Sequence, residues 1–180
     1  LAQMGERHPA NRANVLANLG RVHLDLAEPT TARARFEEAL GLAEQTDTHG
    51  LMGEIYYGLG EAALLENDVE HAARRARQAL ANAASSRQRI ELGLGQRLLA
   101  RVAALQPDLV PEGSPSALFT QSEITLRETG DREELAQSLL AHAQHLGQTQ
   151  GDAKHMRALQ REAHALFTDL GMQWRIPGPT

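Results

Sequence analysis

Cysteine is absent from this chain of 180 residues, so neither disulfide bonds nor thiolate metal ligands can hold its fold. Lysine occurs once, at Lys154, and arginine carries the other fixed positive charges. The formal net charge of -5 opposes a broadly cationic surface of the kind that binds a phosphate backbone. We therefore expect no nucleic-acid partner.

Long apolar runs are also missing. No run approaches the roughly 18 residues that a helix needs to span a bilayer, and the first residues do not form the charged and then apolar leader of a secretory signal. These absences predict a cytoplasmic protein without a membrane partner.

The sequence motifs of common enzymes are absent as well. The chain contains no GxxxxGK[ST] phosphate loop, no GxSxG nucleophile turn and no HExxH metal motif. Gly58-x-Gly60 and Gly93-x-Gly95 superficially resemble a dinucleotide loop, but both lie where helices are expected, and no strand pattern precedes them. We interpret these glycines as places where helices pack closely. The sequence predicts a non-enzymatic protein without a cofactor.

What the chain does contain is an internal repeat with a period of 40 residues. The dipeptides Leu19-Gly20, Leu59-Gly60 and Leu99-Ala100 recur at this spacing. A period of this length is typical of arrays of stacked helices. Within each unit the apolar residues follow helical spacing, and no stretch shows sustained two-residue alternation.

The apolar spacing predicts helices at about 10–27, 30–46, 50–66, 69–84, 88–105, 116–129, 132–149 and 153–170. Asp68 and Asp152 are expected N-caps, Ser114 precedes a proline in a first helical turn, and Asp131 with Glu134 has the spacing of a capping box. The predicted fold is all-α, a stack of about four antiparallel helix pairs that share one continuous apolar core.

The predicted array is a single domain over residues 1–171 with a C-terminal tail at 172–180. Its units are 10–48, 49–87, 88–130 and 131–171, and the third contains a longer connection between its helices. Residues 1–9 are interpreted as the end of a preceding repeat, because Leu1 to His8 align with Gly41 to Thr48. We therefore expect this chain to be a segment of a longer protein.

The motif Leu16-x-x-Leu19-Gly20 followed by Ala32-x-x-x-Phe36 resembles the signature of the tetratricopeptide repeat family. This resemblance implies a right-handed superhelical stack that binds proteins or peptides. The period of 40 exceeds the usual 34 of the family and is similar to the long-helix arrays of bacterial signalling and transcription-regulatory proteins. It implies the regulatory or sensory region of such a protein.

In this family the first helix of each pair lines the concave surface, which makes its exposed positions candidates for partner contact. The register gives two columns on these helices, Ala17, Tyr57 and Arg97 in one and Arg21, Glu61 and Arg101 in the other. A peptide carboxylate could meet Arg97 or Arg101 while Tyr57 serves as an anchor, and Asn14 and Asn18 could hydrogen-bond its backbone. The alternative interpretation is a set of ion pairs between repeats.

Histidines in the last predicted pair support an alternative function. His142 and His145 are three residues apart on one helix, and a third ligand could come from His155, His164 or an acidic side chain. In this reading the chain senses a metal or small signal and controls an attached catalytic domain. Because histidines on amphipathic helices are more often surface or interface residues, no metal is predicted.

The ends of the array are expected to leave apolar surface uncovered, which predicts homo-oligomers formed through the end repeats. Trp174 follows the last predicted helix. Its ring could cap the end of the stack or anchor a partner.

Overall fold

A computed structural model describes residues 9–176 of the protein. Over this range the chain forms helices and no strands. The α-helices are α1 (Pro9–Asp25), α2 (Pro29–Gln45), α3 (His49–Leu65), α4 (Val69–Ser86), α5 (Arg89–Leu105), α6 (Pro115–Thr129), α7 (Arg132–Gln148) and α8 (Ala153–Asp169). Two short 3-10 turns, η1 (Pro107–Leu109) and η2 (Gln173–Arg175), complete the structure.

The helix starts follow from capping side chains that satisfy the free N–H groups of the first turn. Asp68 accepts a hydrogen bond from the His71 N–H at 3.0 Å, and Asp152 accepts from the Lys154 and His155 N–H groups. Ser114 likewise accepts from the Ala117 N–H, ahead of Pro115. These caps are confirmed, and each predicted helix matches the observed one to within two residues at either end.

The capping box predicted at Asp131 and Glu134 forms only in part. Asp131 accepts from the Glu134 N–H at 3.0 Å, but the Glu134 side chain pairs with Arg97 instead of returning to the Asp131 backbone. The Asp131 N–H donates to the Thr129 hydroxyl. The Glu134 side chain therefore pairs with Arg97 of α5 and does not complete the capping box.

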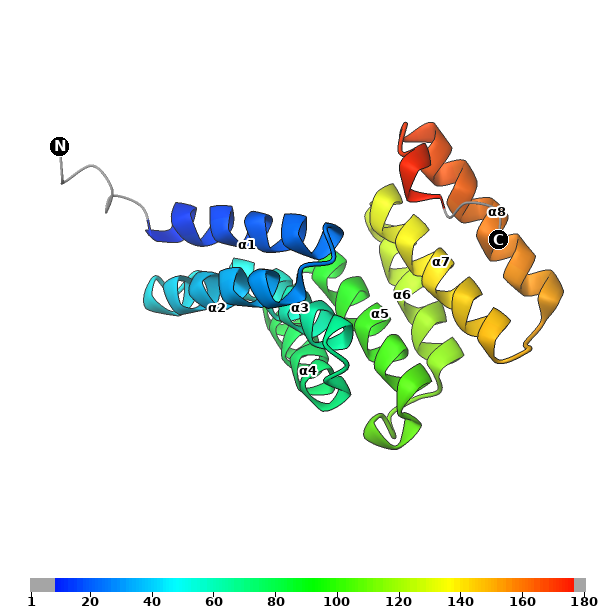
Figure 1. Ribbon diagram of the computed structural model, residues 1–180, viewed down its shortest axis with the longest axis horizontal. Helices are drawn as coiled ribbons and strands as arrows, with labels where there is room; N and C mark the ends of the chain where they lie inside the picture. The colour runs from blue at the N-terminus through cyan, green and yellow to red at the C-terminus, as the bar shows by residue number, and fades with distance from the viewer. Residues whose placement is uncertain (1–8, 177–180) are drawn as a thin grey trace.

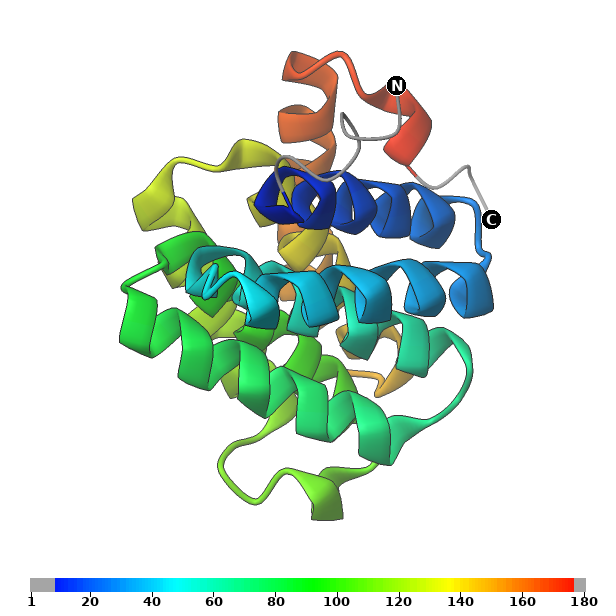
Figure 2. The ribbon, with the colours of Figure 1, turned by 90° about the vertical axis from the view of Figure 1, so that its left-hand side faces the viewer.

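The helices form successive antiparallel pairs that stack from α1 and α2 at one end to α7 and α8 at the other (Figure 1; Figure 2). Each helix packs on its neighbours in the chain, and α1, α3, α5 and α7 also contact one another in sequence. This arrangement is the predicted helical solenoid. None of the helices in the described range is long and apolar enough to cross a membrane.

Helical glycines allow the pairs to approach closely, as the sequence predicts. The Phe36 ring lies between Gly20 and Gly58, where an added Cβ would come within 2.8 Å and 2.2 Å of it. At Gly60 an added Cβ would lie 2.3 Å from Leu98. Phe36 itself is fully buried. The glycines thus provide the space for large side chains in an otherwise alanine-rich core.

Equivalent leucines of the repeat differ in burial. Leu59 and Leu99 are both 2 % exposed, whereas Leu19 is 42 % exposed. Leu19 lies on α1, and within residues 9–176 no earlier helix covers its outer face. The burial that Leu59 and Leu99 share therefore does not extend to Leu19 within the described residues. The predicted repeat end at 1–9 falls almost entirely outside the described residues.

The two ends of the stack are unlike each other. Along α1 and the residue that follows it, an exposed apolar face, which we call the α1 stripe, comprises Val15, Leu19, Val22 and Leu26. The exposed positions of α8 include Lys154, Arg157 and Arg161 instead. Trp174 is 69 % exposed, so of its two expected roles the ring does not fill that of a cap on the last pair. Met172 and Ile176 pack against that pair's core in its place.

Candidate functional site: a groove along the first helices

The inner face of the stack contains a cavity of about 400 Å³. A second one of about 270 Å³ shares Asp25, Tyr57, Glu61, Gln137 and Arg175 with it. The lining comes from the first helix of every pair, α1, α3, α5 and α7, with Phe167 of α8 and the turn η2. We call the two cavities together the groove. Its location agrees with the concave surface that the family resemblance implies.

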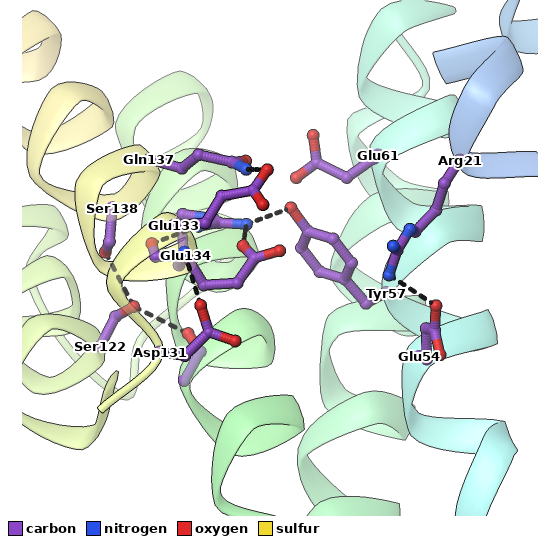
Figure 3. A network of polar contacts seen from close by, with 12 residues as sticks. Arg21, Glu54, Tyr57, Glu61, Ser122, Asp131, Glu133, Glu134, Gln137 and Ser138 are labelled. Carbon is purple, nitrogen blue, oxygen red and sulfur yellow. Dashed lines mark hydrogen bonds and ion pairs between the residues drawn. The ribbon is translucent and has the colours of Figure 1, made fainter. Parts of the chain in front are cut away.

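Arg97 forms the buried floor of the groove. Its guanidinium donates to the Tyr57 hydroxyl at 2.7 Å, to the Glu134 carboxylate at 2.7 Å and to the Glu134 carbonyl at 2.9 Å. It is 3 % exposed. The network in Figure 3 thus joins three consecutive pairs, because Tyr57, Arg97 and Glu134 lie on α3, α5 and α7.

Tyr57 and Arg97 each keep a single protonation state at neutral pH. Burial raises the pKa of the Tyr57 phenol well above its usual value, so the group stays neutral. Burial lowers the pKa of Arg97, whereas Tyr57 and Glu134 raise it, and the net pKa lies above the usual value. Arg97 is therefore a permanent cation, and it makes three hydrogen bonds to Tyr57 and Glu134.

The two other predicted arginines are also paired. Arg101 donates to the Glu61 carboxylate, which raises the pKa of Arg101. Arg21 donates to Glu54 at 2.9 Å instead of pairing with Glu61, its neighbour in the predicted column. These contacts match the alternative interpretation, in which the columns consist of ion pairs between repeats.

The structure brings together five of the seven predicted site residues. Tyr57, Glu61, Arg97 and Arg101 line the larger cavity, and Arg21 lines the smaller one with Tyr57 and Glu61. Asn14 and Asn18 are exposed on α1, where the Asn18 amide donates to Asn14 at 2.8 Å. Neither asparagine is among the residues that line the groove.

Sequence reasoning missed the contribution of α7. Helices α5 and α7 begin 43 residues apart, at Arg89 and Arg132. With this shift the columns continue to Leu140 and Gln144, and both residues line the larger cavity. The longer connection recognised in the third unit is the signal that could have supplied the corrected register. The contribution of Arg175 in η2 had no such periodic signal.

The histidines of the last pairs form an aromatic cluster. His142 is 1 % exposed, its ring stacks on Phe119 at 5.2 Å, and its Nδ1 lies 2.7 Å from Glu123 Oε1. His145 lies against Phe119 as well, and burial, with a smaller contribution from His142, lowers the pKa of His145. Within the described part of the chain no three His, Asp or Glu side chains are arranged to hold a metal ion.

The fold defines the class of this protein as a helical repeat scaffold with a groove along its first helices. The family model described as Tetratricopeptide repeat matches residues 11–85, which covers nearly all of the first two pairs. Residues 11–85 are therefore similar to tetratricopeptide repeats, which generally mediate protein–protein interaction and form non-catalytic scaffolds. No curated protein matches the chain.

Proposed function

We propose that the groove binds an extended segment of a partner protein, and that the chain is the regulatory or sensory region of a larger bacterial signalling or transcription-regulatory protein in the cytoplasm. The observation that carries this proposal is the groove itself. Side chains from four successive first helices converge on it. An elongated site of this kind suits an extended peptide better than a compact small molecule.

The groove lining contains the groups that such a segment needs. Gln137 and Gln144 on α7 have amides that can donate to and accept from a peptide backbone. Leu140 and Trp174 provide apolar surface beside them. This alternation of amide and apolar surface supports recognition of an extended chain with moderate affinity.

A photo-crosslinking experiment tests the proposal. A photoreactive benzoylphenylalanine is placed at Gln144 in the groove, and a matched variant carries it at Gln78, which is exposed on α4 and does not line the groove. In cells that express the full-length protein, the Gln144 variant should form a discrete crosslinked species, because a partner segment lies against that position. Mass spectrometry then identifies the partner.

The Gln78 variant should not form that species. Equal crosslinking at both positions, or none at Gln144 under conditions in which the full-length protein is active, would exclude the groove as the binding surface. Identification of the partner also tests the proposed regulatory context.

We also propose that the α1 stripe mediates self-association. The corresponding residues of α3, Ile55, Leu59 and Ala62, are buried between pairs. The α1 stripe therefore has the composition of an interface between helix pairs and stays open within the described residues.

A further inference from the structure

The carboxylates that line the groove outnumber the arginines that the helices of the stack contribute to it. The carboxylates are Asp25, Glu61, Glu133 and Glu134, and the arginines are Arg21, Arg97 and Arg101. Three arginines on α1 and α5 each have a carboxylate partner, in the pairs Arg21–Glu54, Arg97–Glu134 and Arg101–Glu61. Asp25 on α1 and Glu133 on α7 remain outside these pairs. Among the described residues, the cation that reaches both is Arg175, which comes from η2 and not from the helices of the stack.

Arg175 lies between the first and the last pair, in a site that we call the acidic seat. This seat consists of the carboxylates of Asp25 and Glu133. Its Nη1 and Nη2 donate to the two oxygens of Asp25 at 3.3 Å and 3.2 Å, and its Nη2 lies 3.6 Å from Glu133 Oε1. The two-pronged contact with Asp25 is the geometry in which a guanidinium recognises a carboxylate. This part of the groove therefore holds a guanidinium group of the chain itself.

The seat is not saturated by the protein's own tail. Among residues 9–176, the Glu61 oxygen Oε1 and the Arg175 Nε are both buried without a hydrogen-bond partner, although the two residues line the same cavities. The contacts to Asp25 are also longer than the usual 2.7–2.9 Å of a charge-assisted hydrogen bond. A better-fitting arginine would make shorter contacts and satisfy the Glu61 oxygen.

Trp174 adds a second recognition element. The Arg175 guanidinium lies 4.6 Å from the centre of the Trp174 ring, and this ring is largely exposed at the mouth of the larger cavity. A cation held against an aromatic face is stabilised by the ring quadrupole. The tail therefore presents an aromatic-arginine pair to an acidic seat.

We propose that the groove recognises an arginine-bearing segment of the partner protein, and that Arg175 occupies the same seat in cis as an internal competitor. This inference rests on the proposed function and adds the chemistry of the partner. It reverses the expectation of a carboxylate-bearing ligand, because Arg97 and Arg101 are already neutralised by Glu134 and Glu61. Release of the tail would leave Asp25 and Glu133 without a cation.

Binding of a tail-derived peptide in trans tests this proposal. The probe is a fluorescent peptide with the sequence of residues 172–176, and the proteins are the whole chain and its Arg175→Ala variant. We expect the variant to bind the probe roughly tenfold more tightly than the unaltered chain, because a tethered competitor acts at a high effective concentration. Binding should weaken as salt is added, since the seat is acidic and partly exposed.

Substitutions in the protein and in the probe test whether the probe binds at the acidic seat. In the Arg175→Ala background, Asp25→Asn should abolish the gain, whereas Asp108→Asn, at an exposed position outside the groove, should leave it intact. A probe in which citrulline replaces arginine keeps the shape without the charge and should not bind. Because Asp25 is exposed, circular dichroism of the Asp25→Asn variant should remain unchanged.

Equal affinity of the unaltered chain and the Arg175→Ala variant, binding of the citrulline probe, or preference for a probe with glutamate in place of arginine would each overturn the proposal. The crosslinking at Gln144 separates this failure from failure of the proposed function. A crosslinked partner segment without arginine would refute the arginine seat while leaving the groove as a protein-binding site.

Discussion

At the scale of single residues, the glycines decide how closely the helix pairs approach. Gly58 faces the ring of Phe36, whereas Gly41, also within a helix, has no atom within 4 Å of the position of an added Cβ. The same substitution at the two positions therefore has opposite physical consequences. One would overfill the core, and the other would add only a favourable helix former.

We predict that Gly58→Ala lowers the free energy of unfolding by about 1–3 kcal/mol, because the buried Phe36 ring has little room to move. Gly41→Ala should instead raise it by up to about 1 kcal/mol. Urea denaturation followed by circular dichroism measures both changes. Stabilisation by Gly58→Ala would contradict the close packing described here.

At the scale of helices and turns, much of the fold follows from local chemistry. Asp68, Asp131, Asp152 and Ser114 mark helix starts through their caps, and the apolar period defines the helices between them. Contacts between pairs were less accessible to sequence reasoning. Glu134 illustrates this limit, because only the approach of Arg97 from another pair decides where its side chain goes.

The cap at Asp131 gives a test at this scale. We predict that Asp131→Ala destabilises the protein by about 1 kcal/mol, because the Glu134 N–H loses its acceptor at the start of α7. Asp131→Asn should retain most of the stability, since an asparagine oxygen can accept the same bond. Thermal unfolding of the three proteins compares them, and an equal loss in both variants would show that the charge matters more than the cap.

At the scale of the whole molecule, the sequence predicted the stack of helix pairs but not every residue that lines the groove. The repeat register put Tyr57 and Arg97 in one column on successive first helices, and in the structure their side chains form a hydrogen bond. Arg175 lies beyond the last helix, where no period applies. Its position depends on how the complete stack curves, which is a property of all pairs together.

Self-association belongs to this scale as well. We predict that the chain forms dimers through the α1 stripe as its concentration increases, and that Leu19→Glu makes it monomeric by placing a charge in that apolar face. Ile124→Glu is the matched control, because Ile124 is 54 % exposed on α6, away from the stripe. Analytical ultracentrifugation measures the association. A monomeric unaltered chain at all concentrations would refute the interface.

The ion pair between Arg175 and Asp25 connects residues that are 150 positions apart in the chain. In a helical repeat array the units contact chiefly their neighbours, whereas this pair joins the end of the first helix directly to the turn that follows the last one. A partner arginine that displaced Arg175 from Asp25 would remove this direct connection, so partner binding and contact between the two ends of the stack would exclude each other.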